Sequence, residues 1–137
     1  MQDPFVGTWK LNTGRSEFDA NHRPSAGTMV FELDGEGHYL MRAEGLKANG
    51  ERVAERPQRF IPDGVEHAIP DFPGLTAVTT RLDANTLRGE ARREDGSVVG
   101  GGTYAVSSDG KILTATNFGW DSQLREFQQK TVWDRVE

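Results

Sequence analysis

The sequence of 137 residues contains no cysteine. This absence excludes a disulfide framework, a thiolate metal site and a thiol nucleophile. The sequence also lacks an apolar run long enough to cross a membrane as a helix, and its start has no signal-peptide pattern. A chain that enters its first strand directly after residues 1–4 fits a cytoplasmic protein or a mature domain whose export signal was removed. We favour an exported protein, periplasmic or secreted.

A basic excess is missing as well, because 21 acidic residues outnumber 16 basic ones and the net charge is −5. Nucleic-acid-binding proteins usually carry a basic patch or stripe. The densest basic cluster here is Arg88, Arg92 and Arg93, and it is interleaved with Glu90 and Glu94. Such mixing is typical of a solvated strand face. We therefore expect no nucleic-acid partner, and these patterns leave the oligomeric state open.

Turn signals rich in Gly, Asn and Asp recur along the whole chain, whereas long helical periods of apolar residues are missing. The segments between the turns are short and rich in strand-forming residues, which predicts an antiparallel meander. We expect strands over 5–12, 27–34, 38–47, 51–61, 65–69, 75–82, 86–94, 97–107, 111–118 and 124–136. Closure of such a meander removes bare edges. The prediction is therefore one all-β domain over 1–137, an up-and-down barrel of 8–10 strands. The segment 13–26 is expected to be irregular or to form one helical turn capped by Ser16.

Alternation along the strands predicts which side chains face the interior. The expected inner set contains Gly7, Trp9 and Leu11 on the first strand, Met29, Phe31 and Leu33 on the second, Ile112, Thr114, Thr116 and Phe118 on the ninth, and Phe127, Gln129, Thr131 and Trp133 on the last. Polar residues mix with apolar ones on the strands 38–47 and 51–61, and either inward face stays open there. This mixture fits a wet or ligand-filled cavity, or a rim where both faces meet water, because a buried polar group without a partner costs about 1–3 kcal/mol.

The two ends of the chain resemble known barrel families. Residues 5–11, Phe-Val-Gly-Thr-Trp-Lys-Leu, resemble the first strand of fatty-acid-binding proteins and the Gly-x-Trp motif of lipocalins, and residues 131–136 resemble the last strand of the former. Continued through residues 12–18, the opening is similar to that of bacterial lipocalin-like proteins of the calycin superfamily, many of which are exported. The resemblance implies a barrel in which Gly7 and Trp9 belong to the plug at one end and Arg135 packs over Trp9. It also implies a small hydrophobic ligand as partner.

The last strand departs from the fatty-acid-binding pattern. Those proteins grip the ligand carboxylate with an Arg-x-Tyr pair, and the matching positions here are Thr131 and Trp133. The arginine is therefore missing. The segment 13–26 is also too short and too broken for the two-helix lid of that family. The resemblance thus favours a lipocalin-like binder over a fatty-acid carrier.

Three functional hypotheses follow from these patterns. In the first, the barrel binds or transports a small apolar ligand without catalysis, between walls that include Met29 and with the site residues Phe31, Arg42, Arg59, His67, Phe118, Phe127, Gln129 and Trp133. In the second, an enzyme of isomerase, lyase or hydrolase type uses His67 or a buried carboxylate as base. In the third, a filled barrel acts through its surface. The histidines His22, His38 and His67 lie far apart in sequence, without metal-binding spacing, so we expect no metal and no cofactor.

Overall fold

The computed structural model describes residues 3–17, 24–47, 49–54, 57–69, 72–120 and 126–136, and every structural statement below concerns these residues. They contain strands and turns but no helix. The described strands are β1 (Gly7–Glu17), β2 (Pro24–Leu33), β3 (Tyr39–Lys47), β4 (Arg52–Ala54), β5 (Gln58–Phe60), β6 (His67–Ala68), β7 (Leu75–Asp83), β8 (Thr86–Arg93), β9 (Val98–Val106), β10 (Ile112–Trp120) and β11 (Glu126–Arg135). No helix in this part of the chain could therefore cross a membrane.

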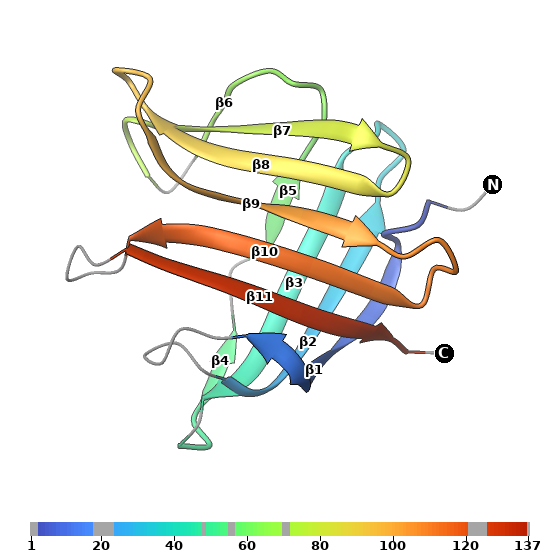
Figure 1. Cartoon of the computed structure of the whole chain (residues 1–137). Coiled ribbons are helices and arrows are strands. Elements are labelled where there is room, and N and C mark those ends of the chain that lie inside the picture. Colours follow the sequence, from blue (N-terminus) through green and yellow to red (C-terminus); the bar gives the residue numbers. More distant parts are fainter. Residues whose placement is uncertain are drawn as a thin grey trace.

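The strands form one antiparallel sheet in the order β4-β3-β2-β1-β11-β10-β9-β8-β7-β6, with β5 also paired to β3. The first and last strands are neighbours, as closure of a meander requires. The sheet is not closed, because β6 at one edge does not pair with β4 or β5, which both pair with β3 at the other edge. In Figure 1, β7 to β11 form a front layer that crosses β1 to β5 behind it, and both termini lie at the same end. The predicted all-β antiparallel barrel architecture is confirmed, with eleven strands because the segment 51–61 divides into β4 and β5.

The segment after the first strand differs from the expectation. β1 continues to Glu17 with an irregular register between Asn12 and Glu17, so Ser16 does not cap a helical turn. The Ser16 hydroxyl donates to the Asn12 carbonyl at 2.7 Å and accepts the N–H of Val132 at 2.8 Å. It thus ties the irregular part of β1 to β11. The remainder of this segment, 18–23, lies outside the described residues.

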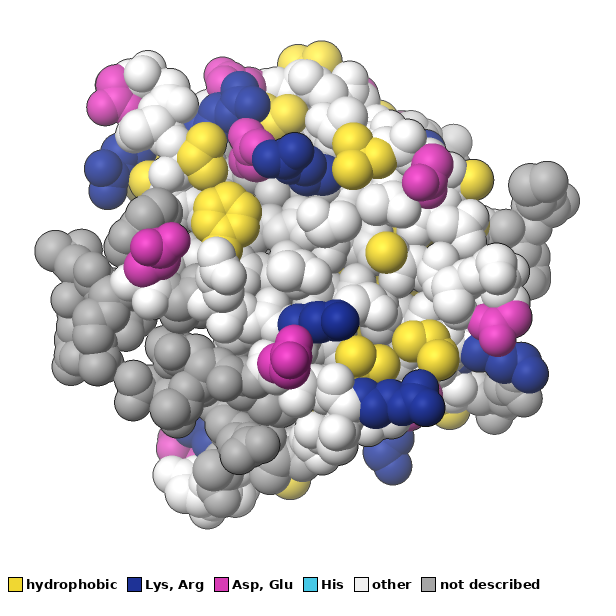
Figure 2. Space-filling model, in the orientation of Figure 1, with side chains coloured by type: hydrophobic (Ala, Val, Ile, Leu, Met, Phe, Trp, Pro, Cys, Tyr) yellow, Lys and Arg dark blue, Asp and Glu magenta, His cyan; other side chains and the backbone are white. Residues whose placement is uncertain are grey.

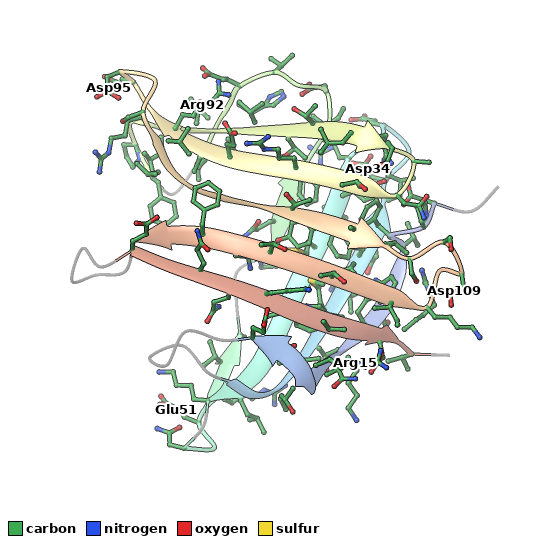
Figure 3. All side chains as sticks on the ribbon, in the orientation of Figure 1. Arg15, Asp34, Glu51, Arg92, Asp95 and Asp109 are labelled. Atoms are coloured by element: carbon green, nitrogen blue, oxygen red, sulfur yellow. The ribbon has the colours of Figure 1, made fainter. Side chains whose placement is uncertain are left out.

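Most predicted turns are built from the expected residue types. The Asp95 carboxylate accepts the N–H of Ser97 at 2.8 Å, and Asp109 accepts the N–H of Lys111 at 3.0 Å. Gly96 and Gly110 follow with φ of 87° and 74°, which glycine adopts without strain. In Figure 3, Asp34 and Asp109 lie toward the end that holds the termini, and Asp95 lies at the other end. β10 continues to Trp120, two residues beyond the end expected for the strand 111–118.

The pairing of β10 with its neighbouring strands shows which of its faces points into the interior. Leu113 of β10 pairs with Trp133 of β11 and is fully buried, and Ala115 is also buried. The predicted inner set of this strand, with Phe118, is therefore wrong. Phe118 is opposite Gly101 and points outward. Both faces of β10 mix threonine or asparagine with apolar residues, so its polarity carries no period-2 signal.

The interior faces of the other strands follow from the same pairings. Trp9 and Met29 are opposite each other and buried, as alternation predicts, whereas Leu33 at the rim is 45% exposed. On β3 the face left open by the sequence is resolved, since Tyr39 and Met41 are buried. On β5, Gln58 and Phe60 pair with Met41 and Tyr39 and share their face.

One end of the interior is filled by aromatic and aliphatic side chains. This core consists of Phe5, Trp9, Met29, Phe31, Tyr39, Met41, Leu87, Val106, Leu113 and Ala115. Phe31 and Tyr39 meet edge to face with ring centroids 6.3 Å apart, and Tyr39 stacks on Phe60 at 5.5 Å. Such geometries add to the burial of apolar area. The end of the barrel near the termini is therefore packed.

Arg135 covers the tryptophan at this end. Its guanidinium lies 4.3 Å from the centroid of the Trp9 ring. It also donates to the carbonyls of Pro4 at 2.6 Å, Val6 at 2.8 Å and Gly110 at 2.6 Å. Gly7 has φ of 142°, and a Cβ at this position would collide with the guanidinium. The glycine of the Gly-x-Trp motif thus leaves the space that the arginine occupies.

The N-terminal segment is fastened over the same end. The Tyr39 hydroxyl donates to the Asp3 carboxylate and accepts from Arg81 at 2.5 Å. Burial, and next the hydrogen bond to Asp3, raise the pKa of Tyr39 to about 12. The hydroxyl therefore stays protonated as a donor at neutral pH. The Trp9 indole donates to the Phe5 carbonyl at 3.0 Å.

We expect the Arg135→Met substitution to lower the free energy of unfolding by about 2–4 kcal/mol, because it removes the stacking on Trp9 and three hydrogen bonds from a charged donor. Urea unfolding followed by tryptophan fluorescence measures this change. Lys130→Met, at an exposed position of the same strand, is the matched control and should stay within about 0.5 kcal/mol of the parent protein. Equal midpoints for the two variants would contradict the role of Arg135.

Candidate functional site

The opposite part of the interior contains a cavity of about 330 Å³. It lies between β3 and β5 on one side and β7 to β10 on the other, beside the place where the sheet is not closed. Its lining consists of Met41, Gln58, Phe60, Ile69, Ala77, Val78, Thr79, Gly89, Glu90, Ala91, Gly101, Gly102, Tyr104 and Asn117. The cavity therefore borders the packed core at Met41, Phe60 and Tyr104.

The space exists because interior positions here carry small side chains. Ala77, Gly89 and Ala91 share the interior face of β7 and β8. At the other end of the interior, large side chains fill the space instead. A Cβ built on Gly89 would meet its nearest atom, the Thr79 hydroxyl oxygen, only at 3.9 Å. This glycine therefore faces open space, and its missing side chain is part of the cavity.

The glycine run 100–102 serves a second purpose. β9 runs through these glycines without interruption. A Cβ on Gly101 would lie 2.5 Å from the Gly89 carbonyl oxygen, and one on Gly102 would collide with the Thr116 carbonyl. The neighbouring backbones approach β9 so closely that only glycine fits.

A row of hydrogen-bonding groups crosses the interior face of five strands. Successive pairings place Thr79 opposite Gly89, Gly89 opposite Gly102, Gly102 opposite Asn117 and Asn117 opposite Gln129. We call these five residues the amide row. Its two glycines separate Thr79 from the amides of Asn117 and Gln129. The side-chain amide oxygen of Gln129, Oε1, is buried and has no hydrogen-bond partner among the described residues.

The predicted aromatic residues do not form one site. Phe31 is fully buried in the packed end, with its ring centroid 6.0 Å from that of Tyr104. Trp133 lies on the interior face, and its indole donates to the Thr131 hydroxyl at 2.9 Å. Phe118 points outward, as described above. Phe127 pairs with Gly119 on the interior face of β11, but its side chain lies outside the described part of the structure.

The predicted polar residues Arg42, Arg59 and His67 do not line the cavity. Arg42 is exposed on the outer face and pairs with Glu32 at 2.5 Å. Arg59 is exposed at the β2–β3 turn, where it pairs with Asp34 at 2.9 Å. Because side chains alternate along a strand, Arg42 and Arg59 point away from the interior face. Of the predicted polar residues, Gln129 faces the interior.

His67 lies in β6 at the free edge of the sheet. Its side chain is 51% exposed, and Nε2 lies 2.9 Å from the Asp63 carboxylate. The N–H of Val65, and next His67, hold the pKa of Asp63 below its usual value. The pair is thus an exposed acid–imidazole contact rather than a group inside the cavity.

A cluster of Asp34, Glu36 and His38 offers ligand atoms within 4.8 Å of one another. Arg59 donates to Asp34 at 2.9 Å and to Glu36 at 3.4 Å. The guanidinium therefore already supplies positive charge to these carboxylates. The Asp34 carboxylate also accepts the N–H groups of Glu36 and His38, so the cluster serves the turn.

We expect the pKa of Asp34 to be about 2, because the hydrogen bond from Arg59 and next that from the His38 N–H stabilise the carboxylate. A lowered pKa means that folding is favoured by this group above pH 4, and that the contribution is lost as pH falls toward 2. NMR titration of the Asp34 carboxyl carbon measures it. In Arg59→Gln the pKa should rise toward its ordinary value, whereas Arg42→Gln should leave it unchanged. An Asp34 pKa near 4 in the parent protein would contradict this account.

The sequence patterns did not single out Gln58 and Asn117 as site residues. Gln58 shares its face with Phe60 on β5, and Asn117 alternates with Leu113 and Ala115 on β10. The signal for Asn117 was its spacing from Leu113, but Phe118 next to it favoured the other face. The cavity is thus lined by uncharged amides where guanidinium groups were expected.

The outer face carries the charges. Figure 2 shows Lys and Arg side chains next to Asp and Glu side chains, with small scattered hydrophobic groups, over β7 to β11. Arg92 pairs with Glu90 at 3.0 Å and with Glu66 at 3.2 Å, and Arg88 pairs with Glu90 at 3.1 Å. The interleaved charges of β8 thus form a solvated strand face, as the sequence predicts.

Comparison of the chain with known proteins supports the fold. A scan against models of protein families gives no match, and a search of curated proteins gives none. Among solved structures, the chain is similar to the fluorescent protein UnaG, with 14% identity over 99% of this chain and 100% of that one and a TM-score of 0.65. It is also similar to zebrafish ileal bile acid-binding protein complexed with cholic acid, with 11% identity over 97% and 99% of the chains and a TM-score of 0.59.

A third similar structure is As-p18, an extracellular fatty acid binding protein, with 14% identity over 98% of this chain and 97% of that one and a TM-score of 0.53. The chain therefore has the architecture of the calycin-like β-barrels to which fatty-acid-binding proteins belong. At these identities the likeness concerns the fold. The narrower resemblance to bacterial lipocalin-like proteins stays a prediction.

Proposed function

We propose that residues 1–137 form a single-domain, non-catalytic protein that binds a small, largely apolar molecule in the cavity between β3–β5 and β7–β10. The observation that carries this proposal is the contrast between the two ends of the interior. One end is filled by Trp9, Phe31 and Tyr39, whereas the other contains a partly open cavity of about 330 Å³ beside Ala77 and Gly89. Ligand pockets commonly measure about 300–1,000 Å³.

The lining supplies the two kinds of contact that such a site needs. Met41, Phe60 and Tyr104 offer apolar surface, which provides most of the affinity for a small ligand. Gln58, Thr79 and Asn117 offer a few polar groups that orient it. These residues take the places that the sequence-based hypothesis gave to Arg42, Arg59 and His67.

The neighbours in fold support the proposal at a coarse level. Zebrafish ileal bile acid-binding protein is complexed with cholic acid in its structure, and As-p18 is an extracellular fatty acid binding protein. Fold alone does not fix function, because unrelated functions share one architecture. The proposal therefore rests on the cavity of this chain, and a bacterial lipocalin-like binder remains its more specific form.

We expect the chain to bind the neutral fluorescent probe 1-aminoanthracene, and the Gly89→Leu substitution to weaken binding at least tenfold, because a leucine would fill the open space beside this glycine. Fluorescence titration measures both. Arg88→Leu is the matched control. It places a leucine in the position of Arg88, one residue earlier and on the outer face, and should leave the dissociation constant of the probe unchanged.

Native mass spectrometry of gently purified protein gives an independent readout. A co-purified small molecule in the parent protein, lost in Gly89→Leu and kept in Arg88→Leu, is the expected result. Equal probe binding by Gly89→Leu and the parent protein would place the bound molecule elsewhere and would refute this site.

A further inference from the structure

We propose that the cavity selects uncharged ligands that present a hydrogen-bond donor, such as an amide, a lactam or an alcohol on an apolar body, and discriminates against carboxylates. This inference rests on the proposed function, because it concerns the chemistry of the ligand in the same cavity. Three observations carry it: the charges of the lining, the positions of the interior cations, and the uncharged polar groups of the lining.

The first observation concerns the charges of the lining. Among the described residues that line the cavity, Glu90 is the single one with a charged side chain. It alternates with the interior positions Gly89 and Ala91, so its side chain leaves toward the outer face. There it pairs with Arg88 and Arg92. The Glu90 carboxylate is therefore already paired, and no described lining residue offers a positive charge to a ligand.

The second observation concerns the interior cations. Pairing with Trp9 and Leu87 places Arg135 and Arg81 on the interior face. Arg135 is held by Trp9 and by three backbone carbonyls at the packed end. Arg81 donates to the Tyr39 hydroxyl and lies 3.7 Å from Asp3. Both guanidinium groups already have partners, and the core separates them from the cavity.

A carboxylate in the cavity would therefore lose its hydration without gaining an opposite charge from the described lining. An ionised group transferred from water to a site of low polarity costs far more than a neutral polar one. A neutral amide or alcohol loses much less hydration and can use the same apolar walls. The difference between the two ligand types is therefore a difference in desolvation.

The third observation concerns the uncharged polar groups of the lining. Gln58, Thr79 and Asn117 line the cavity and carry hydroxyl or amide groups. Their oxygen atoms can accept a hydrogen bond from an N–H or O–H group of a ligand. A neutral ligand with such a donor can therefore pair with these oxygens, whereas a carboxylate cannot.

The test compares two ligands that differ only in their polar end, decanamide and decanoate, by displacement of 1-aminoanthracene at pH 7.5. We expect decanamide to bind at least tenfold more tightly than decanoate. In Asn117→Leu, which removes one amide from the lining, decanamide should lose about fivefold in affinity, as expected for one hydrogen bond, and decanoate should lose less. Thr116→Leu, on the neighbouring exposed position of the same strand, is the matched control and should bind both ligands like the parent protein.

The melting temperature separates folding from binding. Asn117→Leu should melt close to the temperature of the parent protein without ligand, because leucine has the same branched arrangement of side-chain heavy atoms as asparagine and this position lines the cavity. Decanoate binding equal to or tighter than decanamide binding would overturn the selectivity while leaving the cavity as a binding site. Absence of binding by the probe and by both ligands would refute the proposed function itself, and the selectivity with it.

Discussion

The contact between the Arg135 guanidinium and the Trp9 ring joins the last strand to the first and closes one end of the interior. Gly7 admits this contact because a side chain there would occupy the space of the guanidinium. The same arginine holds the carbonyls of Pro4 and Val6, so the N-terminal segment covers the end. A fixed closed end gives the sheet a defined inner surface, and the position of the cavity at the other end depends on it.

The volume of the side chains then decides where the interior is filled. Large residues such as Phe31 and Leu87 belong to the core near the closed end, whereas Gly89, Ala91 and Gly102 occupy positions farther along the same sheet. A sheet of this curvature can be packed or can hold one small ligand. The chain does both, at opposite ends, because its small residues are concentrated on β8 and β9.

The charges follow the opposite rule. Strand alternation sends the side chains of Arg42 and Arg88 to the outer face, where each is more than half exposed and forms an ion pair. Exposed pairs of this kind contribute little to stability, but they leave the interior to uncharged groups. The similar solved structures share the architecture, whereas the polar groups inside the cavity belong to this chain, since sites differ among proteins of one fold.

The sequence by itself determined the all-β meander, the adjacency of the first and last strands and the inward face of β1, β2 and β11, because apolar and polar residues alternate clearly there. It did not determine the face of β10, where Leu113 and Phe118 lie on opposite sides and both sides are mixed. The partners of Arg59 and His67, and the line of groups from Thr79 to Gln129, were decided by the tertiary structure alone. The physical reason is that register across neighbouring strands brings together residues far apart in sequence, and alternation within one strand carries no information about that register.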